Sequence, residues 1–194
     1  MSWVVGFAVF VAFVLAMESV GRTVDRARFP WGYADSGHPA LAGTWVGPLV
    51  TASGQRLGML MDLELAPLDR GRRRSAPLFR TRRSHWLEAR VLVCTIPGGI
   101  RRLKASGKPD DTNTASTFHL GASPADTVGP DGLQPSTIKG RWDGGDKVDL
   151  TVSLYMRKGK SAVSSTGDPN TGPDQHTTLG RGTETQFNSL CSGR

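Results

Sequence analysis

A pattern of alternating glycine and tryptophan occurs twice in the chain and constrains its fold more than any other feature. Residues 41–47 (LAGTWVG) and residues 138–144 (IKGRWDG) both read aliphatic-x-Gly-x-Trp-x-Gly. In a β-strand alternate residues share a face, so the aliphatic residue, the glycines and the tryptophan of each copy point the same way. Small residues beside a large ring suit the crowded inside of a small barrel or sandwich. Both copies therefore predict strands with Trp45 and Trp142 in the interior.

Period-2 alternation elsewhere in the chain supports the same fold class. It is clearest in residues 57–65, where Met59 and Met61 belong to the apolar face and the opposite face is expected to be wet, and it recurs in residues 87–93 and 148–156. The 24 glycines and 12 prolines favour strands joined by turns over helices. We predict an all-β domain over residues 41–156, an antiparallel up-and-down barrel or sandwich of about seven to eight strands behind one N-terminal apolar helix.

The N-terminal segment is unlike the rest of the chain. Trp3 to Met17 is an uninterrupted apolar run without a charge, whereas a helix on the surface of a soluble domain would carry a polar stripe. Residues 1–20 therefore predict a transmembrane anchor or a signal segment. No Lys or Arg precedes the run, which weakens the signal-peptide interpretation, and the anchor requires the helix to continue to about residue 20. A helix buried in a soluble domain is the third alternative, but one small domain offers little protein to surround it.

Two segments flank the predicted barrel. Residues 21–40 have the composition of a stalk, in which Trp31 and Tyr33 either contact lipid headgroups or a partner, or pack on the outside of the domain. Residues 157–194 are rich in Ser, Thr, Gly, Pro and charge, which predicts an extended C-terminal tail over the barrel with at most one late strand.

The side of the membrane on which the domain lies is indicated by two opposing signals. Arginines directly after the apolar run favour the cytoplasm by the positive-inside rule. A β-domain with two cysteines behind an N-terminal apolar segment is instead typical of exported proteins. We expect a membrane-anchored protein with a periplasmic or otherwise extracytoplasmic domain, in which Cys94 and Cys191 form a disulfide.

Positive charge is concentrated in one block of the chain, residues 69–85, within a formal net charge of +7. A block this dense repels itself, which predicts a solvated loop. Its guanidinium groups could also bind carboxylates of a protein partner or lipid headgroups, whereas a membrane segment argues against nucleic acid. The candidate contact residues are Arg70, Arg72, Arg73, Arg74, Arg80, Arg82 and Arg83.

The chain contains no recognisable motif for catalysis or metal binding. The four histidines are far apart, with no spacing typical of a metal site. The sequence contains no nucleophile elbow, no phosphate-binding glycine loop and no Cys-x-x-Cys motif. We therefore predict a protein that is not an enzyme and has no cofactor, metal ion or catalytic residues.

The segment Gly43-Thr44-Trp45, early in an antiparallel meander, resembles the Gly-x-Trp that opens the first strand of lipocalins and the similar segment of avidins. Both families are calycin-type up-and-down barrels. The resemblance covers these residues and the strand pattern of about residues 40–156. The chain departs from lipocalins in its arginine block and in having no recognisable C-terminal helix, and from avidins in lacking their later tryptophans. The resemblance implies a barrel and does not carry over a ligand.

The expected function is that of a non-catalytic, membrane-anchored β-barrel subunit that binds and stabilises a larger membrane protein assembly of respiratory, photosynthetic or envelope type. A single apolar helix, a basic block and a long polar tail offer separate contact surfaces without offering a reaction. The alternative is a lipocalin-like carrier with a small apolar ligand between Trp45, Trp142, Met59 and Met61. An open interior would favour the carrier and a filled interior the scaffold.

Overall fold

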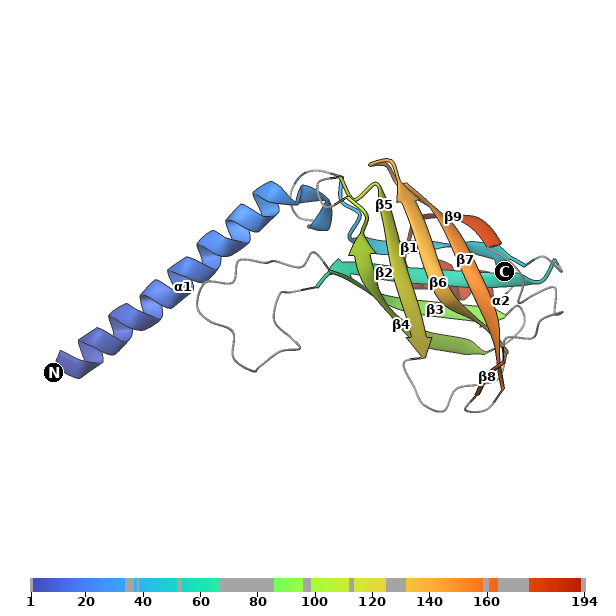
Figure 1. Cartoon of the computed structure of the whole chain (residues 1–194), viewed down its shortest axis with the longest axis horizontal. Coiled ribbons are helices and arrows are strands. Elements are labelled where there is room, and N and C mark those ends of the chain that lie inside the picture. The colour runs from blue at the N-terminus through green and yellow to red at the C-terminus, as the bar shows by residue number, and fades with distance from the viewer. Residues whose placement is uncertain are drawn as a thin grey trace.

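The structure is a computed structural model that describes residues 2–33, 37, 39–51, 54–66, 86–95, 99–111, 114–124, 132–158, 161–163 and 175–192. Figure 1 shows a long N-terminal helix that extends away from a β-barrel. The helical elements are α1 (Ser2–Arg28), the 3-10 turn η1 (Pro30–Gly32) and α2 (Glu184–Ser192). The strands are β1 (Gly43–Val50), β2 (Arg56–Leu65), β3 (Leu87–Thr95), β4 (Ile100–Pro109), β5 (Thr117–Pro124), β6 (Gly132–Trp142), β7 (Lys147–Lys158), β8 (Ser161–Val163) and β9 (Gln175–Arg181).

The strands of the described residues form one antiparallel sheet that closes on itself. From β1 to β7, each strand pairs with the next one along the chain. The circle is completed by β9, which lies between β7 and β1, while the short β8 pairs only with the end of β7. The result is the predicted all-β antiparallel barrel, with eight strands in its wall.

Strict alternation in the wall strands places one side chain in two inside the barrel. In β4 every second residue is buried and its neighbours are exposed. Apolar inward residues from all eight wall strands belong to a single cluster, which also includes residues from the segment between α1 and β1. The core is therefore the inside of the barrel, as the period-2 pattern predicts.

The glycine of the second Gly-x-Trp copy is required by a close approach inside the barrel. Gly140 of β6 lies directly opposite Phe118 of β5, and a Cβ atom at residue 140 would overlap the Phe118 ring. Trp142 follows on the same face, and its Nε1 donates a hydrogen bond to the carbonyl of Gly145 at 2.9 Å. Gly144 does not share that face, because β6 ends at Trp142 and Gly144 has a φ of +91° in the turn.

The C-terminal region differs from the predicted extended tail. Residues 175–181 are the wall strand β9, and residues 184–192 form α2, which packs outside the barrel. Phe187 of α2 is buried against outward-facing residues of β1, β2 and β3, namely Val46, Leu60 and Leu92. The outer face of β2 is consequently exposed to solvent only in part, because Leu60 is buried beneath α2 whereas Asp62 and Glu64 are not buried.

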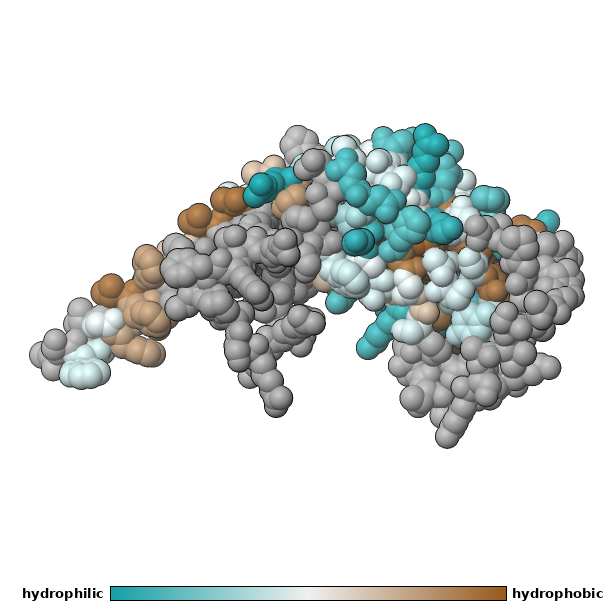
Figure 2. Space-filling model, viewed as in Figure 1, coloured by the Kyte–Doolittle hydropathy of each residue, from teal (hydrophilic) through white to brown (hydrophobic). Residues whose placement is uncertain are grey.

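The N-terminal helix α1 is 27 residues long and continues beyond the predicted anchor into the first part of the predicted stalk. Its large apolar side chains are bare, with Phe7 71% and Phe10 63% exposed, and Figure 2 shows them as a brown surface along the helix. In the part of the chain that the structure describes, no helix combines the length and the apolarity needed to cross a membrane. The predicted transmembrane segment is thus not found there.

Candidate functional site

Side chains of the described residues pack together inside the barrel. Trp45, Met59 and Met61 have no exposed surface and Trp142 has 5%. These four residues were predicted as interior residues, and all of them belong to the same buried cluster. All four are therefore core residues of the barrel.

Trp45 is fixed at one end of the barrel by contacts from two directions. Its Nε1 donates a hydrogen bond to the carbonyl of Leu41 at 2.9 Å, which satisfies the only polar group of the buried indole. The guanidinium of Arg181, at the end of β9, stacks on the ring with its Cζ 3.8 Å from the ring centre. This cation-π contact joins β1 to β9 across a ladder of only two residue pairs.

Arg181 also holds the segment that precedes β1. Its two terminal nitrogens donate hydrogen bonds to the carbonyls of Ala42, at 2.9 Å, and Ala40. Burial lowers the pKa of Arg181, and the nearby carboxylate of Asp146 raises it in part. An arginine starts from so high a pKa that the group stays charged at neutral pH. No periodic pattern in the sequence singles out Arg181, and its role follows only from the closure of the barrel by β9.

The junction between α1 and the barrel is a compact apolar turn. Phe29 and Trp31 are 5% and 3% exposed, and their rings meet edge to face at 6.3 Å. The carbonyl of Trp31 accepts hydrogen bonds from the backbone of Leu41 and Ala42, so η1 closes this end of the barrel. The prediction that Trp31 contacts lipid or a partner is wrong in this structure, because the chain turns back at η1 and buries the indole.

Tyr33 is the more accessible aromatic residue of the junction. It is half-buried, and the guanidinium of Arg26 lies 5.8 Å from its ring centre. Residue 26 belongs to the last turn of α1. The contact therefore links the end of the helix to the turn that seals the barrel.

The described residues that flank the predicted arginine block are paired with each other. The backbone N–H of Ala66 donates a hydrogen bond to the carbonyl of Trp86. The side chain of Leu65 packs against Gly32 of η1, leaving no room there for a Cβ atom. The seven candidate arginines lie outside the described residues: Arg70, Arg72, Arg73, Arg74, Arg80, Arg82 and Arg83.

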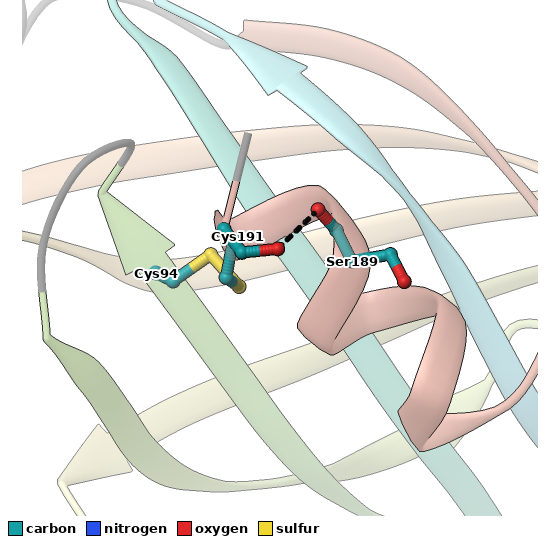
Figure 3. The surroundings of a disulfide bond; sticks show 4 residues. Cys94, Ser189 and Cys191 are labelled. Carbon is teal, nitrogen blue, oxygen red and sulfur yellow. Dashed lines mark hydrogen bonds between the residues drawn. A yellow bond between two sulfur atoms is a disulfide. The ribbon is translucent and has the colours of Figure 1, made fainter. Parts of the chain in front are cut away.

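The cysteines predicted to pair are bonded in the structure. Figure 3 shows the disulfide between Cys94 of β3 and Cys191 of α2. The neighbouring residue of β2 is Gly58, where a Cβ atom would lie 2.7 Å from the sulfur of Cys94 and 3.3 Å from that of Cys191. Because Gly58 has no side chain, it leaves room for the disulfide that attaches α2 to the outside of the barrel.

Metal-binding side chains are not gathered into a site in the part of the chain that the structure describes, where no group of three or more His, Cys, Asp or Glu residues could hold an ion. No protein-family model matches the chain, and no curated protein matches it. Among solved structures, the chain is similar to "EF1p2_mFAP2b bound to DFHBI" at 11% sequence identity and a TM-score of 0.43. The match covers 73% of this chain and 94% of that one.

Proposed function

We propose that this protein is a non-catalytic β-barrel subunit that α1 attaches to a larger membrane protein assembly. The observation that carries the proposal is the bare apolar surface of α1, on which Phe7, Phe10 and Phe13 are each more than 60% exposed. Contiguous apolar surface of this kind is rarely left in contact with water and marks an interaction site. The apolar helices and acyl chains of a membrane assembly would cover it.

The charges at the barrel end of α1 agree with an attachment of this kind. Arg26 and Arg28 are exposed in the last turn of the helix. Guanidinium groups beside an apolar segment suit acidic headgroups and carboxylates of a partner protein. Arg26 and Arg28 would then contact the same membrane assembly as the apolar part of α1.

In this proposal the barrel is the rigid domain that α1 attaches to the assembly. Its interior is filled by residues such as Trp45 and Met61, which favours a scaffold over the alternative, a lipocalin-like carrier with a small apolar ligand inside. We retain the calycin-like description for the barrel itself, since eight-stranded barrels of this size can be filled. The Cys94–Cys191 disulfide supports an extracytoplasmic location, because such bonds persist in oxidising compartments.

A mild-detergent pull-down of the full chain tests the proposal, with identification of the proteins that elute with it. The variant Phe7→Gln/Phe10→Gln/Phe13→Gln makes one stretch of α1 polar, and Phe7→Leu/Phe10→Leu/Phe13→Leu is the matched control that keeps it apolar. We expect the leucine variant to retain the membrane partners and the glutamine variant to lose them. A wild-type protein that runs alone as a monomer, or a glutamine variant that keeps every partner, would overturn the proposal.

A further inference from the structure

The outer face of β4, β5 and β6 carries charge of one sign. Five cationic side chains on β4 and β6 are exposed, and none of these three strands contains Asp or Glu. The strands on either side do contain carboxylates, Glu88 in β3 and Asp149 in β7. Figure 2 shows hydrophilic residues over the part of the barrel where Figure 1 draws β5, β6 and β7. The five cations are Arg102, Lys104, Lys108, Lys139 and Arg141.

The register of the strands brings some of these cations into one row. Lys108, His119 and Lys139 are direct neighbours across β4, β5 and β6. The Cα atoms of the two lysines are therefore about 10 Å apart, which is two strand spacings. At that separation the repulsion in water is only about 0.4 kcal/mol. The protein tolerates this weak repulsion, and an anion bound between the two lysines would be attracted by both.

A groove of about 750 Å³ adjoins this row on the outside of β5, β6, β7 and β9. Its volume lies within the range of sites that bind small molecules. Side chains from all four strands line it, which gives the groove polar groups on opposite sides. They include His119, Lys139, Arg141, Asp149, Thr151 and His176.

Two carboxylates, Asp110 and Asp149, also line the groove, and Asp149 is the direct cross-strand neighbour of Arg141. Asp149 Oδ1 accepts a hydrogen bond from the hydroxyl of Thr178 at 2.6 Å, and the carboxylate of Asp110 lies 3.4 Å from His119 Nε2. On the other side, Thr151 Oγ1 is within hydrogen-bond distance, 3.0 Å, of His176 Nδ1. These contacts hold the side chains in place around the two cations of β6, Lys139 and Arg141.

A tetrahedral anion matches this arrangement better than a planar one. A phosphate group offers three acceptor oxygens that point in different directions, whereas a carboxylate offers two in one plane. The donors come from different strands, with a guanidinium and an ammonium on β6, and imidazole and hydroxyl groups on β5, β7 and β9. Arginine in particular binds phosphate through two parallel hydrogen bonds.

We propose that the outer groove of β5, β6, β7 and β9 is a binding site for a phosphate-bearing ligand, with Lys139 and Arg141 as its charged contacts. The phosphate could belong to a soluble phosphate monoester or to the headgroup of an acidic phospholipid. The site is built entirely from the barrel, so it does not depend on the attachment proposed for α1.

The test measures binding of two probes to the full chain: glycerol 3-phosphate by titration calorimetry in detergent, and vesicles containing phosphatidic acid by co-sedimentation after the detergent has been removed. The variant Lys139→Gln/Arg141→Gln removes both cations from the groove. Arg102→Gln/Lys104→Gln is the matched control, because it removes two exposed cations from the neighbouring β4 without touching the groove. We expect the groove variant to lose about tenfold or more in affinity and the control to change by less than about threefold.

The two probes also distinguish the source of the phosphate. Binding of glycerol 3-phosphate that depends on Lys139 and Arg141 identifies a soluble ester, whereas binding of vesicles alone with the same dependence identifies a lipid headgroup. The proposal is overturned if the wild-type chain binds neither probe, or if both variants lose affinity equally, which would indicate only a general attraction by the basic face. The Phe7→Gln/Phe10→Gln/Phe13→Gln variant should still bind glycerol 3-phosphate if the soluble-ester result holds, so failure of α1 attachment and failure of the groove are separable.

Discussion

The inside of the barrel and the surface of α1 are built from the same kinds of side chain but bury them to opposite extents. Phe118 in the barrel has no exposed surface, while Phe13 in α1 is 62% exposed. The barrel brings every second residue of eight strands into one enclosed cluster. In contrast, α1 makes its main described contact only with η1. The barrel thus buries its own apolar residues, whereas those of α1 named above remain exposed.

This comparison predicts that stability and attachment are separable properties. Substitutions within the barrel should lower its free energy of unfolding because they remove buried contacts. Substitutions on α1 should leave that free energy unchanged and alter only what the protein associates with.

Removal of the disulfide should have the largest effect on the barrel. The bond joins residues 97 positions apart, and for such a loop the chain-entropy model gives a loss of about 4.7 kcal/mol. The variant is Cys94→Ala/Cys191→Ala, measured by denaturant unfolding followed by fluorescence. Ser189→Ala, on the exposed side of α2, is the control and should stay within about 0.5 kcal/mol of wild type. A double cysteine variant as stable as wild type would mean that α2 does not need the bond.

Trp45→Ala should follow, with a loss of about 4 kcal/mol. The substitution leaves a cavity in the closed core and removes the ring on which Arg181 stacks. Trp86→Ala is the matched control, because that indole is 41% exposed and its loss should cost about 1 kcal/mol or less. Equal destabilisation by the two variants, in the same unfolding assay, would contradict the view that the core is concentrated inside the barrel.

The smallest effect is expected from the polar variant of α1. Phe7→Gln/Phe10→Gln/Phe13→Gln should change the free energy of unfolding of the barrel by less than about 0.5 kcal/mol, since these side chains are exposed. Hydrogen exchange of the β-strand amides gives an independent measurement. If the strands lost protection in this variant, α1 would be part of the barrel's stability and the comparison would fail.

Strand periodicity explains why most of the barrel could be predicted from the sequence. Inward and outward residues alternate strictly in strands such as β4, and the two tryptophans mark the interior. The sequence predicted β9 only as a possible late strand, because Leu179 is its only large apolar residue. Its place in the wall is decided by pairing with β7 and β1, far away in the sequence.

The outer face of β1 to β3 shows a second limit of the same reasoning. The alternation in residues 57–65 and 87–93 puts Leu60 and Leu92 on the outward faces, and α2 covers them. Only the coincidence of outward apolar residues on three neighbouring strands could have signalled a cover, and that coincidence is visible only once the register is known. For the candidate sites, the interior residues and the cysteine pair could be predicted, whereas Arg181 and the outer groove depend on strands that meet only in the closed barrel.

The seam between β1 and β9 sets the order in which the barrel can be completed. Arg181 and Ala42, which meet there, are separated by 139 residues. At 5 to 20 residues per second, a ribosome delivers the second residue roughly 7 to 28 s after the first. Neighbouring strands from β1 to β7 can pair as they emerge, because each contacts the next along the chain. Closure of the ring must wait for β9, and docking of α2 must wait longer still, so the strands from β1 to β7 can form a sheet before the barrel closes.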